Sequence, residues 1–134
     1  GVEPEASLFK AAQDAFGGRM KPAQAGLRRA FAEGEGGADA LRALSLHYNR
    51  LKLLKSLLEK GMGTKEAARA AGVFWKDEND LLRQAQAWRF DALDALAADL
   101  IEADKLCKST GMPDALISER LYLQIAGKAA RAGL

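Results

Sequence analysis

Cysteine, histidine, proline and long hydrophobic runs are all scarce in this sequence of 134 residues, which has one Cys, one His and three Pro. The single Cys107 cannot form an internal disulfide, which suits a protein of the reducing cytoplasm. No run of about 18 apolar residues exists, so we expect no membrane-spanning segment. The sequence does not contain the basic start followed by an apolar stretch that is typical of a signal peptide. We therefore expect a cytoplasmic protein.

The side chains that most enzymes use are equally scarce. His47, the single histidine, lies at the border of an apolar helix face, which favours a packing or surface role over that of a general base. One cysteine and one histidine cannot form a structural zinc site, and Cys107 lies on the apolar side of its helix. No Gly-x-x-x-x-Gly-Lys-Ser/Thr loop is present to bind a nucleotide phosphate. We expect no catalytic residues, no metal site and no cofactor.

Size and charge are those of one ordinary globular domain. Apolar residues make up 49% of the chain and charged residues 28%, as in chains that fold around a core. The formal net charge of +2 is too small to indicate nucleic acid or an anionic membrane as a partner. The sequence begins Gly1-Val2-Glu3-Pro4 without an initiator Met, so we expect a fragment of a longer protein.

Apolar residues recur throughout with the 3.6-residue period of amphipathic helices, and no segment alternates apolar and polar residues as a strand would. Glycines, prolines and capping residues divide the chain into about seven helices, two of them long. The predicted helices cover residues 3–16, 21–33, 41–60 with a start near 36–39, 64–71, 77–88, 90–108 and 116–130. We therefore predict an all-α bundle that forms a single domain over residues 1–134.

The predicted helix at residues 41–60 carries two apolar stripes, and the rest of the chain is organised around it. The wider stripe, which belongs in a core, consists of Leu41, Leu44, Tyr48, Leu51, Leu54 and Leu58. The narrower stripe consists of Leu46, Leu53 and Leu57. A helix with two apolar stripes has two neighbours. The second neighbour is either another part of this chain or another subunit.

Asp104 is the charged residue that helical phase places inside an apolar arc, between Leu93 and Ala97. An unpaired carboxylate buried there would be strongly destabilising, so we expect it to have a partner. Arg50 and Arg120 are the candidates for a structural ion pair with it.

Residues 64–88 have an alternative interpretation as a helix-turn-helix. Ala67-Ala68 and Gly72-Val73 stand where that motif has small residues and its turn. The second helix would then enter a major groove, but its first turn carries three acids that repel DNA: Asp77, Glu78 and Asp80. We favour the interpretation that residues 64–88 have the local geometry of a helix-turn-helix but use it for packing within the domain.

Five marked segments follow one another along the chain: Leu41-Arg42-Ala43-Leu44 with Leu51-Lys52-Leu53-Leu54-Lys55, Gly72-Val73-Phe74-Trp75-Lys76, residues 83–88, and residues 101–111 before a closing helix. In this order they resemble the C-terminal collar domain of the bacterial DNA polymerase III delta subunit. The resemblance covers nearly the whole chain, because residues 8–34 resemble the two helices that open that domain.

The resemblance implies a role in the clamp loader, the AAA+ machine that opens the sliding clamp and closes it around primed DNA. Collar domains of that family form a ring of helices that holds the subunits together, which implies gamma/tau and delta-prime as partners. Delta grips the clamp through its N-terminal domain, which is absent from this sequence together with the AAA+ modules. We therefore expect no ATP binding, no clamp opening and no polymerisation by this chain, and contact with primed DNA at most indirectly.

A collar domain must bury apolar surface against its neighbours. The candidates are the narrower stripe and three aromatics: Leu46, Leu53, Leu57, Phe74, Trp75 and Trp88. Core filling is the alternative role for the aromatics. The turn at residues 108–112, which lies near the template strand in relatives, lacks a base-stacking aromatic here. Two other functions stay open: a self-associating helical adaptor, and DNA binding through residues 64–88.

Overall fold

Every regular element in the computed structural model is helical; the model describes residues 4–134, with side chains from residue 6 onward. Within this range the order is α1 (Pro4–Phe16), α2 (Met20–Ala32), α3 (Gly37–Glu59), α4 (Thr64–Ala70), the 3-10 helix η1 (Trp75–Asp77), α5 (Glu78–Ala87), α6 (Phe90–Cys107) and α7 (Asp114–Arg131). The prediction of an all-α fold with seven α-helices is confirmed for the described residues.

The lengths of the helices differ from the prediction in one respect. Besides α3 with 23 residues and α6 with 18, α7 is also long and has 18 residues. The sequence predicted this helix over residues 116–130, and in the structure it begins two residues earlier and ends one residue later. Its C-terminal half is held in the core, because Ile125, Ala126 and Ala129 are all buried. The bundle therefore has three long helices instead of two.

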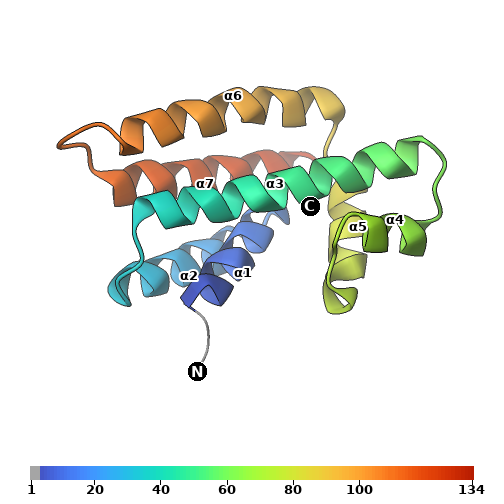
Figure 1. Cartoon of the computed structure of the whole chain (residues 1–134), viewed down its shortest axis with the longest axis horizontal. Helices are drawn as coiled ribbons and strands as arrows, with labels where there is room; N and C mark the ends of the chain where they lie inside the picture. Colours follow the sequence, from blue (N-terminus) through green and yellow to red (C-terminus); the bar gives the residue numbers. More distant parts are fainter. Residues whose placement is uncertain (1–3) are drawn as a thin grey trace.

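Helix α3 is the centre of the arrangement (Figure 1). The three long helices α3, α6 and α7 lie lengthwise along the molecule, with α1 and α2 below one end and α4 and α5 below the other. α3 packs against α1, α4, α5, α6 and α7, whereas α7 packs against α1, α2, α3 and α6. The largest fully buried apolar side chains are Leu8, Phe16, Leu27, Leu44, Leu51, Leu54, Trp88, Leu93, Leu96, Tyr122 and Ile125.

The wider apolar stripe of α3 faces this core, as the sequence predicted. Five of its six members are buried, and Leu58, near the C-terminal end, is partly buried. The helix ends where predicted: Gly61 has φ +92°, its N–H bonds the Leu58 carbonyl at 3.0 Å, and the N–H of Met62 bonds the Leu57 carbonyl at 3.1 Å. This pair of bonds satisfies the last carbonyls of the helix and turns the chain toward α4.

The N-termini of α3 and α7 are locked together. The backbone N–H of Gly37 donates to the Asp114 carboxylate at 3.2 Å, so one acid caps a helix that begins 77 residues earlier in the sequence. One turn further along α3, the buried Tyr122 hydroxyl donates to the Ala40 carbonyl at 2.6 Å. The two backbones approach so closely that a Cβ on Gly37 would lie 2.6 Å from the carbonyl carbon of Asp114.

We predict that Gly37→Ala lowers the free energy of unfolding by about 1 to 3 kcal/mol, because the new methyl group forces the α3–α7 junction apart. Gly127→Ala is the matched control. Gly127 lies inside α7, where an added Cβ would meet only the tip of Arg131 at 3.5 Å. This control should raise stability by up to about 1 kcal/mol, since alanine favours a helix interior over glycine. Urea denaturation of both variants measures the difference, and a Gly37→Ala variant as stable as the wild type would contradict the prediction.

Candidate subunit interface

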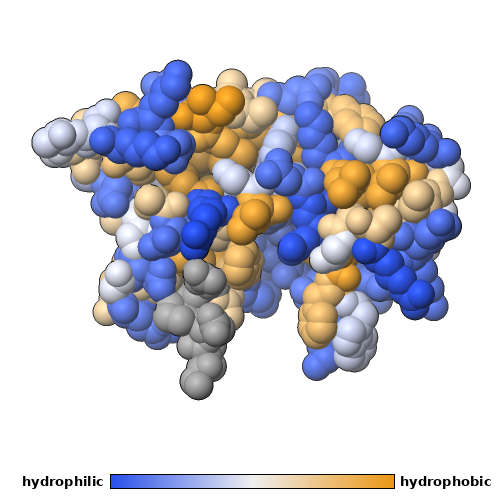
Figure 2. Space-filling view, in the orientation of Figure 1, coloured by the Kyte–Doolittle hydropathy of each residue, from blue (hydrophilic) through white to orange (hydrophobic). Residues whose placement is uncertain are grey.

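The narrower stripe of α3 is only partly covered by the described part of the chain. Leu46 and Leu53 are 42% and 46% exposed, and Leu57 is partly buried against the core. Phe74 and Trp75 add to the apolar surface from the connection between α4 and α5, with exposures of 56% and 68%. Figure 2 shows hydrophobic patches over α3 and at the lower end of the α4–α5 segment. We call these five residues the candidate interface surface.

Trp88 does not belong to this surface, which corrects the sequence-based prediction. Only 1% of the residue is exposed. Its indole N–H donates to the Phe16 carbonyl at 2.9 Å, and the two rings lie with centroids 5.6 Å apart. The last turn of α5 faces the end of α1, so this aromatic fills the core. The structure thus separates it from Phe74 and Trp75, which the sequence pattern could not do.

A groove lies beside the candidate interface surface, with a volume of about 380 Å³. Ala6 and Phe9 of α1 form one wall, and residues 73–81 form the other, with Phe74 at the rim. His47 and Arg50 of α3 form the floor. In Figure 2 the groove appears as a recess between α1 and the lower end of the α4–α5 segment.

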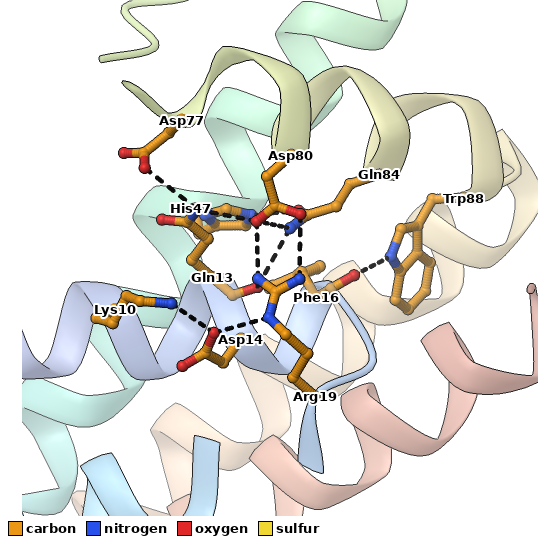
Figure 3. A network of polar contacts seen from close by, with 10 residues as sticks. All are labelled: Lys10, Gln13, Asp14, Phe16, Arg19, His47, Asp77, Asp80, Gln84 and Trp88. Atoms are coloured by element: carbon orange, nitrogen blue, oxygen red, sulfur yellow. Dashed lines mark hydrogen bonds and ion pairs between the residues drawn. The ribbon is translucent and has the colours of Figure 1, made fainter. Parts of the chain in front are cut away.

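Arg19 holds the two sides of this region together (Figure 3). Its guanidinium donates through Nε to Asp14 at 2.9 Å, and through Nη1 and Nη2 to Asp80 at 3.1 and 2.7 Å. Asp14 belongs to α1 and is buried, whereas Asp80 belongs to α5. Lys10 adds a second cation to Asp14 at 2.7 Å. One guanidinium therefore bridges carboxylates from two helices that are far apart in sequence.

Two glutamines extend this network to α3. Gln13 donates to Asp80 at 2.9 Å and to Asp77 at 3.4 Å. The fully buried Gln84 donates from Nε2 to the Gln13 carbonyl and to Asp80, both at 3.2 Å. Its amide oxygen therefore points to His47, whose Nε2 lies 2.7 Å away. Because this oxygen only accepts, the His47 Nε2 carries the proton and donates.

The network fixes the charge state of its members. Burial lowers the pKa of His47 to about 4; the Gln84 hydrogen bond opposes this shift, and the nearby Arg50 contributes to it. Burial alone would raise the pKa of Asp80, but hydrogen bonds from Arg19 and Gln13 outweigh it and lower the pKa. The hydrogen bond to Asp80 raises the pKa of Arg19, although burial opposes this. At neutral pH the ion pairs stay charged and the imidazole stays neutral.

The predicted ion pair of Asp104 needs a correction. Its side chain is about half exposed and pairs with Lys108 at 2.8 Å, one helical turn along α6. The predicted partners Arg50 and Arg120 are both exposed and do not pair with it. Helical phase placed Asp104 in an apolar arc, but α6 lies at the edge of the bundle and buries a narrower arc than its apolar residues span. An exposed pair of this kind contributes under about 0.5 kcal/mol.

Two of the three acids of the helix-turn-helix interpretation, Asp77 and Asp80, accept hydrogen bonds in the network between α1 and α5. Asp80 is bound by Arg19 and Gln13, and Asp77 accepts a weaker bond from Gln13. These contacts do not favour DNA reading.

Cys107 was predicted to be buried, but it is only partly buried, and this burial raises the pKa of its thiol. Its sulfur lies 3.7 Å from the Asp114 carbonyl. The raised pKa does not favour a nucleophilic role for this cysteine.

Sequence reasoning missed several exposed apolar residues, among them Phe9 and Ile101. Phe9 and Ile101 have the helical spacing of core residues, yet both are exposed, and Phe9 lines the groove. The preceding residue of each one could have indicated its exposure. Leu8 and Leu100 are buried one position earlier, and adjacent residues of a helix point about 100° apart, so only one of each pair can face the core.

Neither a cluster of metal ligands nor a membrane-spanning helix is found among the described residues. No group of three or more His, Cys, Asp or Glu side chains in this part of the chain is placed to hold a metal ion. None of the helices described is both long and apolar enough to cross a membrane.

Among solved structures, the chain is similar to the Bacillus subtilis DNA clamp loader delta protein (YqeN), with a TM-score of 0.75 and 17% sequence identity. The match covers 93% of this chain and 37% of that protein, so this chain spans little more than a third of its length. No protein-family model and no curated protein matches the sequence. At this identity the likeness establishes a fold shared with a clamp loader protein.

We predict that Arg19→Ala lowers the free energy of unfolding by about 2 to 4 kcal/mol, because the buried Asp14 loses one partner and Asp80 loses its bridging cation. Lys10→Ala is the matched control. It removes the other cation from the same carboxylate, but Lys10 is 65% exposed, so the loss should stay below about 1 kcal/mol. Equal losses in urea denaturation would show that the network does not depend on the guanidinium bridge.

His47 gives a prediction for the pH dependence of stability. The unfolded chain protonates this side chain below its ordinary pKa of 6.5, whereas the folded chain resists protonation down to about pH 4. Stability contributed by the neutral imidazole is therefore present above pH 6.5 and is lost as the pH falls toward 4, by up to about 1.4 kcal/mol for each pH unit. Urea denaturation between pH 7 and 4.5 should show a steeper loss for the wild type than for His47→Gln. Parallel curves would contradict the burial of a neutral histidine.

Proposed function

We propose that this chain is a non-catalytic subunit-assembly domain, the collar domain of a delta-type clamp loader subunit. Residues 1–134 form that single domain, and the AAA+ modules lie outside this sequence. The proposal rests on one observation above all. A fold similar to that of a clamp loader delta protein leaves an apolar stripe on its central helix uncovered.

The uncovered stripe is suited to protein contacts by its position and composition. Leu46 and Leu53 lie on the longest helix, whose opposite side is held in the core, so the surface that they form is rigid. Full burial of a wholly exposed leucine is worth about 1.5 to 3 kcal/mol, and these two, which are already more than half buried, would each gain about half of that. Together with Phe74 and Trp75, these side chains supply the apolar and aromatic anchors that dominate protein interfaces.

The polar groups of the chain support a structural role. His47, the single histidine, is buried and donates to Gln84, and its low pKa keeps it neutral. Asp14 and Asp80 are held by Arg19. The side chains with the strongest interactions are therefore committed to joining helices, and we assign no catalytic residue and no cofactor to this chain.

The partners that we propose are the gamma/tau and delta-prime subunits of a clamp loader in the cytoplasmic replisome. Contact with the sliding clamp would require the parts of a delta subunit that are outside this sequence, and primed DNA would be contacted at most indirectly. The first test is size-exclusion chromatography with light scattering. We expect the chain, mixed with gamma/tau and delta-prime, to enter a larger complex at one copy. A stable homodimer that ignores these subunits would favour a self-associating adaptor instead.

We predict that Leu53→Asp abolishes entry into that complex while leaving the chain folded. The side chain is half exposed, so a carboxylate there meets water in the monomer but would be buried without a partner in an interface. Leu116→Asp is the matched control, since Leu116 is exposed on α7, outside the candidate interface surface. Circular dichroism checks folding. Normal assembly by the Leu53→Asp variant would exclude the stripe from the interface, and loss of folding would show that Leu53 belongs to the core.

A further inference from the structure

We propose that the groove between α1 and the α4–α5 connection binds one face of an acidic amphipathic helix from a neighbouring protein. Apolar side chains of that helix would contact Phe9 and Phe74, and its carboxylates would meet Arg50 and Lys76. This inference rests on the proposed function, because it names the chemistry of the partner surface that docks beside the candidate interface surface.

The shape and lining of the groove carry the apolar half of the proposal. Five of its eleven described lining residues are apolar, among them Phe9 on one wall and Phe74 on the other, and both rings are exposed in the chain alone. Its volume of about 380 Å³ accommodates a few side chains but not a whole helix. Recognition of alternate turns of an amphipathic helix by such a groove is a common mode of peptide binding.

The groove is held in shape before any partner arrives. Gln13 of the α1 wall donates to Asp77 and Asp80 on the opposite side, and Arg19 joins the same two elements below them. Figure 3 shows these bonds crossing between α1 and α5. A partner therefore meets fixed walls and does not lose binding energy in ordering them.

The charges at the groove carry the acidic half of the proposal. Three cations line it, but Lys10 is already paired with Asp14. Among the side chains from residue 6 onward, Arg50 and Lys76 have no carboxylate partner; Lys76 lies 5.3 Å from the centroid of the exposed Trp75 ring. The lining acid, Asp77, is engaged by Gln13. In this part of the chain the unpaired charge lining the groove is therefore positive, whereas His47 beside Arg50 is neutral.

The same charges favour a protein helix over single-stranded nucleic acid. A nucleic acid needs a continuous basic path along its phosphates, with bases stacked on aromatic rings. Among the side chains described from residue 6 onward, Arg50 and Lys76 are the two lining cations without a carboxylate partner, and two separate cations do not form such a path. A helix with separate carboxylates and an apolar face matches the spaced cations and the apolar walls.

The test uses the whole chain and two fluorescein-labelled designed helices. One peptide carries leucines at i, i+3, i+4 and i+7 with glutamates on its other face, and the second has lysine in place of every glutamate. We expect saturable binding of the glutamate peptide by fluorescence anisotropy, weakened by salt, and at least about tenfold weaker binding of the lysine peptide. Equal affinity for both peptides, or no saturable binding of the glutamate peptide, would overturn the proposal.

Variants locate the site. Phe74→Ala should weaken binding by about tenfold or more, whereas Ile101→Ala, which truncates an equally exposed side chain on α6, should not change it. Arg50→Glu combined with Lys76→Glu should reverse the preference between the two peptides, and Lys60→Glu at the exposed end of α3 should not. An unaltered preference in the double variant overturns the charge assignment. Tighter binding of oligothymidylate than of the glutamate peptide would assign the groove to nucleic acid instead.

The two proposals fail separately. If the chain joins the clamp loader subunits but the glutamate peptide does not bind, the collar assignment stands and the acidic helix is the wrong partner for the groove. If the peptide binds in the groove but the chain enters no complex, the groove remains a site for acidic helices and the clamp loader assignment fails.

Discussion

The bridge that Arg19 forms between Asp14 and Asp80 is the interaction on which the shape of this molecule depends. α1 and α5 are not neighbours in sequence, and the apolar contacts of each are made mainly with other helices. A buried carboxylate such as Asp14 needs a cation beside it, and Lys10 and Arg19 both supply one. Arg19 also binds Asp80, so it is the cation that ties α5 to α1. Directional polar bonds thus set the angle between α1 and α5, which apolar packing alone would leave adjustable.

That constraint has a consequence for the surface. The glutamine and arginine bonds fix the spacing between α1 and the start of α5. Phe9 on α1 and Phe74 next to η1 are both exposed and line the groove between these elements. The groove is the result of a fixed spacing between two elements, and its walls keep that spacing in the absence of a partner.

Much of the fold follows from the sequence because local signals decide it. The glycine at 61 and the period of the leucines from 41 to 58 define α3 without reference to any other helix. The site depended on information that periodicity does not contain. Trp88 and Trp75 are both aromatic residues near helix ends, and only the packing of α5 on α1 separates the buried one from the exposed one. Asp104 was misplaced for a related reason, since an apolar arc on α6 does not reveal how much of it a neighbour covers.

The two stripes of α3 differ in what covers them, and that difference bears on function. The sequence alone allowed the narrower stripe to face either this chain or another, and the structure leaves Leu46 and Leu53 uncovered by the residues that it describes. An exposed leucine by itself is unremarkable on a protein surface. Here two of them follow the central helix, two exposed aromatic side chains lie on the α4–α5 connection, and Phe74 of that pair also lines the groove. Apolar area beside a groove that carries cations is typical of a protein-binding surface, and this combination is the physical basis of the proposal that this face takes part in assembly.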